Sequence, residues 1–111
     1  MAKYAEFYIY ETKHIPLKFK REGILANLKT VIVSINQLDV QINKNQDEVS
    51  VDVDNNIIHV YLSQEETGKF QPGRSAKMQV NLYYKDEERD VSVEIDVKVY
   101  DNLYKQVIQN E

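Results

Sequence analysis

Cysteine and tryptophan are absent from this chain of 111 residues, and glycine and proline are scarce. Without cysteine the chain has no disulfide, no thiolate metal site and no cysteine nucleophile. Its three glycines lie too far apart to form a glycine-rich phosphate loop. No apolar run approaches the roughly 20 residues that cross a bilayer, and an acid stands where a secretory signal needs an apolar core. The simplest interpretation is a single domain made in the cytoplasm.

The charge balance is mildly acidic, with a formal net charge of −4. This disfavours generic attraction to nucleic acid. One dense basic stretch exists, and acids at Glu11 and Glu22 flank it, so we interpret it as a solvated edge; its members are Lys13, Lys18, Lys20 and Arg21. A chain of this length is long enough to bury roughly 65% of its unfolded surface in one core.

Strict alternation over residues 90–99 is the strongest pattern in the sequence. Apolar and polar residues take turns, so the segment predicts one strand with a dry face and a wet face. The dry side would carry Val91, Val93, Ile95, Val97 and Val99. A half-buried strand needs a second layer to cover it, which favours a packed antiparallel β domain over a catalytic cleft.

Further strands are expected over residues 4–10, 15–20, 30–36, 40–42, 49–53, 58–62 and 76–85. Pro16 cannot donate to a ladder, so its strand is predicted to lie at a sheet edge or to begin at this proline. Asp54, Asn55 and Asn56 tolerate positive φ and predict a hairpin turn. About seven or eight mostly antiparallel strands indicate an all-β, immunoglobulin-like β-sandwich over residues 1–102. A small open barrel is the main alternative.

A short helical turn is predicted near residues 64–68. Ser63 and Glu66 have the spacing of a capping box. Gly68 is expected to end the turn in a left-handed conformation. Phe70 is expected to plug the core. Pro72 and Gly73 then suit a type II turn, because proline fixes φ and glycine takes positive φ.

The last segment, residues 103–111, is predicted to be a tail. Leu103, Val107 and Ile108 have approximate helical spacing, and Asp101 could cap a short C-terminal helix. Even counted from Asp101 to Glu111, the eleven residues are marginal for a free helix. The segment therefore docks on the domain, docks on a partner, or frays.

Residues for catalysis or metal binding are few. His14 and His59 are the only histidines, and neither belongs to a Ser/His/Asp signature. We expect His59 on a solvated sheet face beside Tyr61. Residues 52–56 begin like a calcium loop, but Ile57 and Ser63 replace its glycine and its bidentate glutamate. We therefore predict a non-enzymatic protein without catalytic residues, cofactor, metal or small-molecule substrate.

Tyrosine is the unusual component, with eight copies against three phenylalanines. Tyr4, Tyr8 and Tyr10 would share one face of the first strand. Tyrosine offers a large apolar ring with a polar tip, which suits protein–protein contacts. The alternative is that these rings only line the sandwich rim. The interaction residues we predict are Tyr4, Tyr8, Tyr10, Leu103, Tyr104, Val107 and Ile108.

The stretch from Asn56 to Leu103 resembles a recurrent segment in small proteins of tailed phages and prophages of Gram-positive bacteria. The resemblance covers residues 57–73, the strand at 78–86 and the final alternating strand. In that segment a strand runs into Leu62-Ser63-Gln64-Glu65-Glu66-Thr67, then Phe70, then Gly73. A similar layout occurs in the immunoglobulin-like N-terminal domain of phage baseplate upper proteins. The chain departs from the pattern at Glu87 and Glu88, where a glycine turn is common, in its tyrosine-rich first strand, and in its tail.

The resemblance implies a virion structural or assembly protein, found in the virion or in the host cytoplasm during assembly. Its partners would be other phage structural proteins or further copies of itself, with neither nucleic acid nor membrane involved. The alternative is a host-directed binding module, either an inhibitor or a carbohydrate-binding β-sandwich. Carbohydrate-binding sandwiches commonly expose tryptophan, which this chain lacks.

Overall fold

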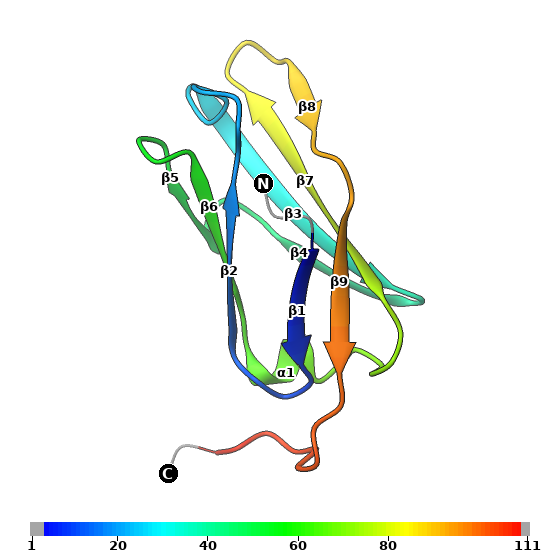
Figure 1. Cartoon of the computed structure of the whole chain (residues 1–111). Helices are drawn as coiled ribbons and strands as arrows, with labels where there is room; N and C mark the ends of the chain where they lie inside the picture. Colours follow the sequence, from blue (N-terminus) through cyan, green and yellow to red (C-terminus); the bar gives the residue numbers. More distant parts are fainter. Residues whose placement is uncertain (1–3, 110–111) are drawn as a thin grey trace.

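A computed structural model describes residues 4–109, which form two β-sheets packed face to face (Figure 1). Nine strands and one short helix lie within those residues. In chain order they are β1 (Tyr4–Tyr8), β2 (Lys13–Lys18), β3 (Leu28–Gln37), β4 (Val40–Lys44), β5 (Val49–Asp52), β6 (Ile57–Leu62), α1 (Gln64–Thr67), β7 (Ala76–Tyr84), β8 (Arg89–Val91) and β9 (Ile95–Tyr100).

The larger sheet has the order β1-β9-β7-β3-β4, and β8 also pairs with β7. The smaller sheet has the order β2-β6-β5. Neighbouring strands are antiparallel except β1 and β9, which run parallel. The expected all-β sandwich is confirmed, and the two separate sheets exclude the alternative of an open barrel. β2 lies at an edge of its sheet and begins before Pro16, so the first of the two expectations from this proline is confirmed.

The core lies between the two inner faces and consists of alternate residues of each strand. β3 contributes Val31, Val33 and Ile35, and β7 contributes Met78, Val80 and Leu82, all of them buried. The smaller sheet supplies Ile15, Leu17, Ile58, Val60 and Leu62. Phe70 is buried as predicted, and its ring meets Phe7 edge to face at a centroid distance of 5.3 Å.

The segment 90–99 is two strands, so the prediction of one continuous strand was wrong. Against β7, the register shifts by one residue between β8 and β9. Ser92 occupies the break, where its hydroxyl accepts from the Val80 N–H and its own N–H donates to the Val80 carbonyl. A shift of one residue exchanges the two faces of a strand. Val91 and Val93 are consequently 51% and 72% exposed, whereas Ile95 is buried.

Helix α1 begins with the predicted capping box. The Ser63 hydroxyl accepts from the Glu66 N–H at 3.2 Å, and Glu66 accepts from the Ser63 N–H at 2.9 Å. Glu66 also pairs with the ammonium of Lys44, a buried residue of β4, at 2.5 Å. Partial burial raises the pKa of Glu66, but the hydrogen bonds from Lys44 and Ser63 outweigh it and lower that pKa.

Gly68 ends α1 in a right-handed conformation, with φ −67°, so the left-handed end predicted there was wrong. The need for glycine is spatial, because a Cβ at this position would lie 2.5 Å from the ring of Tyr10. Gly73 does have positive φ, at 81°, as the type II turn requires. Positive φ also occurs at Asn56, in the predicted hairpin turn, and at Glu87.

Gln37 attaches the loop after α1 to the large sheet. This side chain is only 3% exposed and makes three hydrogen bonds. Its oxygen accepts from the Gln71 N–H at 2.6 Å, and its nitrogen donates to the carbonyls of Gln71 and Arg74, both at 2.9 Å. The loop around Gly73 is therefore held in place by a buried amide.

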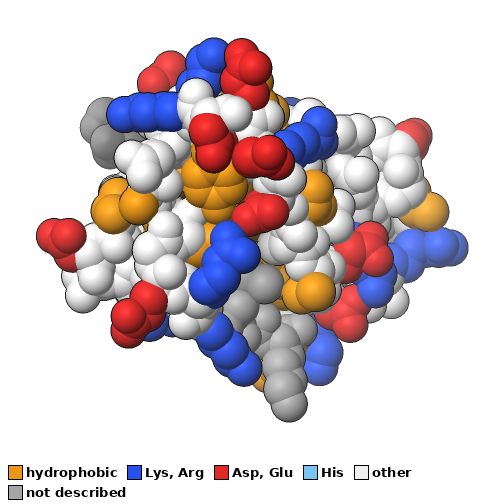
Figure 2. Space-filling model, turned by 90° about the horizontal axis from the view of Figure 1, so that it is seen from above, with side chains coloured by type: hydrophobic (Ala, Val, Ile, Leu, Met, Phe, Trp, Pro, Cys, Tyr) orange, Lys and Arg blue, Asp and Glu red, His pale blue; other side chains and the backbone are white. Residues whose placement is uncertain are grey.

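The end of the sandwich that carries the β5–β6 and β7–β8 turns shows acidic and basic side chains interspersed (Figure 2). One ion pair there joins Arg21 to Asp90 at 2.8 Å, and Asp90 also lies near the hydroxyl of Tyr84. Tyr84 is half-buried at the rim of the core, and its hydroxyl donates to the Ile24 carbonyl. Within residues 4–109, no helix is long enough to cross a membrane.

Candidate functional site

Three tyrosines occupy the outer face of the parallel pair β1 and β9. Tyr8 stands opposite Tyr100, and Tyr4 lies on the same face of β1 as Tyr8. The exposed fractions of Tyr4, Tyr8 and Tyr100 are 49%, 54% and 39%. We name this surface the tyrosine face and define it by Tyr4, Glu6, Tyr8, Lys98 and Tyr100.

Contacts within the tyrosine face hold its rings in place. The rings of Tyr8 and Tyr100 lie 5.3 Å apart between centroids, at an interplanar angle of 35°. The ammonium of Lys98 lies 4.6 Å from the centre of the Tyr4 ring, within range of a cation–π interaction. Rings that are already ordered lose little side-chain entropy when a partner covers them.

The Tyr100 hydroxyl donates to Glu6 Oε2 at 3.1 Å. This hydrogen bond is the main reason why the pKa of Tyr100 is raised, with smaller contributions from desolvation and from the Glu6 charge. The phenol therefore remains protonated at neutral pH. It joins the two strands as a hydrogen-bond donor and leaves its ring face open.

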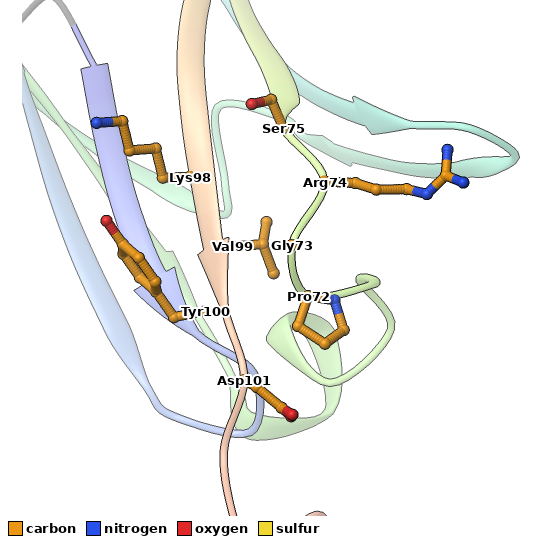
Figure 3. Close-up of a pocket in the computed structure, with 8 residues that line it drawn as sticks. All are labelled: Pro72, Gly73, Arg74, Ser75, Lys98, Val99, Tyr100 and Asp101. Atoms are coloured by element: carbon orange, nitrogen blue, oxygen red, sulfur yellow. The ribbon is translucent and has the colours of Figure 1, made fainter.

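A shallow groove continues from the tyrosine face along β9 (Figure 3). One wall is residues 98–101, and the other is the loop of residues 72–75. The side chains of Lys98 and Tyr100 point from β9 toward β1, and Arg74 points away from the groove (Figure 3). The groove exists because β9 pairs with β7 only over Ala76–Met78. Beyond that stretch, the Gly73 N–H donates to the Val99 carbonyl at 3.0 Å.

The tail after β9 is irregular, with bends at residues 103, 104 and 106, and no helix occurs in residues 101–109, so the predicted C-terminal helix was wrong. The tail runs beneath α1 (Figure 1), where the Gln64 amide accepts from the Ile108 N–H at 2.8 Å and donates to the Ile108 carbonyl at 3.3 Å. Backbone bonding to Gln64 replaces the helical bonds. Leu103, Tyr104 and Ile108 are exposed, and Val107 is half-buried. The last two residues of the predicted tail, 110 and 111, lie outside the residues that the structure describes.

Tyr10 does not share the face of Tyr4 and Tyr8, contrary to the prediction. It follows the end of β1 and has positive φ, at 67°. Its half-buried ring packs against Gly68 and the core. The reversal of the backbone at Tyr10 turns the ring inward, which makes it a packing residue in this structure.

Another groove crosses the outer face of β3, β4 and β7. Most of its lining residues are polar and uncharged, namely Thr30, Ser34, Asn43 and Asn81. The remaining lining residues are the apolar Ile32, the aromatic Tyr83 and the charged Arg89. Arg89 donates twice to the Asn81 oxygen, at 3.0 and 2.7 Å, and the Ser34 hydroxyl donates to Asn43 at 2.7 Å. We name this surface the amide groove.

His59 lies on the outer face of the small sheet beside Tyr61, as predicted. His14 lies next to it on β2, an adjacency that the sequence could not show. Within residues 4–109, no group of three or more His, Asp or Glu side chains is placed to hold a metal ion.

The sequence predicted Tyr4, Tyr8 and residues of the tail as contact residues, and the structure shows all of these except Val107 to be exposed, but the prediction did not include Tyr100 and Lys98 of the tyrosine face. Tyr100 reaches the same surface only through the parallel pairing of β1 with β9. The one feature of the sequence that could have indicated an exposed Tyr100 is its position at the end of an alternating segment, on the polar side with Lys98.

No family model matches the chain, and no curated protein matches it. Among solved structures, it is similar to one described as "crystal structure of chicken TCR for 2.0", with a TM-score of 0.56 and 10% identity. The match covers 92% of this chain and 56% of that chain, so this chain spans little more than half of that one. When strands are lettered along the chain as in variable-type immunoglobulin domains, β2, β6 and β5 take the places of strands B, E and D. Strands β9, β7, β3 and β4 take the places of G, F, C and C′. The comparison shows the fold alone, which is an immunoglobulin-like β-sandwich.

Proposed function

We propose that this chain is a non-enzymatic contact module whose tyrosine face and tail bind other proteins. In its more specific form, the proposal is a structural or assembly protein of a tailed phage or prophage, acting in the virion or in the host cytoplasm. The phage assignment depends on the sequence resemblance of residues 56–103. Its partners are further copies of the chain or other virion proteins.

The observation that carries the contact function is the ordered, half-exposed trio of Tyr4, Tyr8 and Tyr100. Aromatic residues are enriched at protein interfaces, since a ring buries a large area with few rotatable bonds. The groove along β9 extends this surface, and the exposed Leu103 and Tyr104 follow directly in the chain. In a repeating assembly the same surface is used many times, so modest contacts suffice.

The test is self-association of the purified chain by sedimentation velocity across a range of concentrations. The double variant Tyr8→Ser/Tyr100→Ser is expected to shift the distribution toward monomer while keeping the circular dichroism spectrum. Tyr61→Ser is the matched control, because Tyr61 is equally exposed, at 49%, on the opposite sheet. Equal loss of association in both variants, or none in either, would reject the tyrosine face.

The phage role is tested separately. Terminase, portal or tail genes are expected beside the gene for this chain, and its peptides are expected in purified particles or assembly intermediates. Absence from both particles and intermediates would reject a structural role and leave the contact function standing.

A second candidate is a host-directed binding module for carbohydrate, and the amide groove favours it. Its amide and hydroxyl groups around Ile32 and Tyr83 offer hydrogen bonds and an aromatic ring to a polyhydroxylated ligand. Titration with cell-wall oligosaccharides should produce chemical-shift changes in Asn81 and Tyr83 that Tyr83→Ser removes. Shifts scattered outside the groove would reject this candidate. The inhibitor form of the host-directed module has no specific contact in its favour.

A further inference from the structure

The two histidines of the chain meet on the outer face of the small sheet, far in sequence from each other. His14 Nε2 and His59 Nδ1 lie 2.8 Å apart. His14 belongs to β2 and pairs in register with Tyr61, while His59 belongs to β6 and pairs with Pro16, so the imidazoles are diagonal neighbours. This surface is the opposite outer face from the tyrosine face.

The ring nitrogens of the pair face each other, and only one proton fits between them. One imidazole donates and the other accepts, whichever tautomers are present. If that proton moves to the far nitrogen of its ring, both facing nitrogens carry lone pairs, and a turn of each ring away from the line between the two nitrogens directs these lone pairs to one point on the solvent side. Neutral imidazole is a common ligand of zinc, copper and nickel.

We propose that His14 and His59 form a two-histidine chelate for a divalent transition-metal ion, with Cu²⁺ preferred. Water completes the coordination on the solvent side. The site is independent of the proposed contact function, because it shares no residue with the tyrosine face.

The separation of the nitrogens selects the geometry. Two ligands each ~2.0 Å from one ion and about 90° apart are about 2.8 Å from each other, whereas a tetrahedral angle places them about 3.3 Å apart. The observed 2.8 Å matches the spacing of adjacent positions on a square-planar or tetragonal ion, which is the geometry of Cu²⁺ and Ni²⁺, once each ring turns so that its lone pair leaves the line between the two nitrogens. Tetrahedral Zn²⁺ requires the two rings to separate. The Irving–Williams order also places Cu²⁺ first.

Neighbouring side chains from β5 and β6 lie beside the histidine pair. The Tyr61 ring stacks on His14 at a centroid distance of 4.7 Å and an interplanar angle of 12°. Asp52, on neighbouring β5, has a lowered pKa, mainly through hydrogen bonds from Asn55 and to a smaller degree through the charge of His59. Its carboxylate therefore adds negative charge close to the pair. The nearby Lys18 ammonium is engaged by the Asn55 carbonyl at 2.6 Å.

The test is calorimetric titration of the full chain, purified without a histidine tag, with Cu²⁺, Ni²⁺ and Zn²⁺ in turn. The double variant His14→Gln/His59→Gln gives the background, including binding by the N-terminal amine. The unaltered chain is expected to bind one Cu²⁺ above that background, more tightly than Ni²⁺ or Zn²⁺. Each single variant is expected to lose about 30-fold or more in affinity, since a chelate becomes a single contact.

Electron paramagnetic resonance of the Cu²⁺ complex identifies the ligands directly. Coupling to two imidazole nitrogens is expected in the unaltered chain and in the control Tyr61→Phe, and it should be absent from both single variants. Both histidines lie on a solvent-facing sheet surface, so circular dichroism of the glutamine variants should be unchanged. A binding curve that matches the double variant would overturn the proposal. So would single variants that each keep half of the binding, because the histidines would then act separately.

Discussion

Replacing Gln37 by methionine should destabilise the sandwich and loosen the loop that forms one wall of the groove. The side chain is buried, and its amide makes three hydrogen bonds to the backbone of Gln71 and Arg74. Methionine has a similar length but can make none of these bonds. The loop carries Gly73, whose N–H is bonded to the Val99 carbonyl of β9, so the effect should reach the groove.

The magnitude follows from the three bonds. At a net value of about 1 kcal/mol each, their loss costs about 3 kcal/mol. Burial of an apolar methionine end offsets roughly 1 kcal/mol of this, and unpaired backbone groups near the loop add to the cost. We therefore expect the free energy of unfolding to fall by about 2–3 kcal/mol, which corresponds to about 10 °C in Tm for a chain of this size.

The assay is urea unfolding followed by circular dichroism, together with hydrogen exchange of the Gln71 N–H. Gln41→Met is the matched control, because Gln41 is an exposed glutamine on the neighbouring strand β4 with one hydrogen bond to Asn43. It should change the free energy of unfolding by less than about 0.5 kcal/mol. If Gln37→Met behaves like this control and the Gln71 N–H stays protected, the attachment of the loop by Gln37 is wrong.

Three further predictions concern the turns, the divided strand and the ion pair. Glu87→Gly should raise the free energy of unfolding by about 0.5–1 kcal/mol in urea melts, because Glu87 has φ 72°, which glycine adopts without strain; a loss of stability would contradict this. Val97→Ala should lower the free energy of unfolding by about 2–3 kcal/mol, whereas Val93→Ala should change it by less than about 0.5 kcal/mol. Equal losses in the two variants would instead support one continuous strand over residues 90–99. Glu66 has a lowered pKa in the folded state, so its ionised form stabilises the fold above its usual pKa of 4.5 and loses that effect as the pH falls further. Thermal melts of Glu66→Gln should therefore show a weaker loss of stability in acid than the unaltered chain, and parallel acid curves would show that the Lys44 pair contributes nothing.

Local patterns predicted most of the fold because they depend on neighbours in sequence. The alternation of Val31, Val33 and Ile35 specifies a face of β3 wherever that strand lies. The capping box at Ser63 and the turn at Gly73 use backbone rules that act within four residues. The same rules failed at Gly68 and in the tail, where contacts with Tyr10 and with Gln64 decide the conformation.

The candidate site was predicted less completely than the fold. The exposure of Tyr4 and Tyr8 could be predicted, since both are large aromatics on a strand whose other face is apolar, whereas their contact role stays a prediction. Tyr10 was wrongly placed because nothing in its neighbourhood shows that the backbone reverses there. Tyr100 was missed because its contact with Tyr8 depends on strand pairing across more than ninety positions. Pairing over such separations is set by the order of strands in the sheet.

By itself, the sequence determined that this chain forms alternating strands with one dry face, that they stack in two layers, and where several of the turns fall. The tertiary structure alone decided that β1 lies parallel to β9, that one residue at Ser92 reverses the faces of the last segment, and that His14 meets His59. The physical reason is range. Side-chain alternation and capping are satisfied within a few residues, whereas register and cross-strand contacts are fixed only when segments distant in the chain share hydrogen bonds.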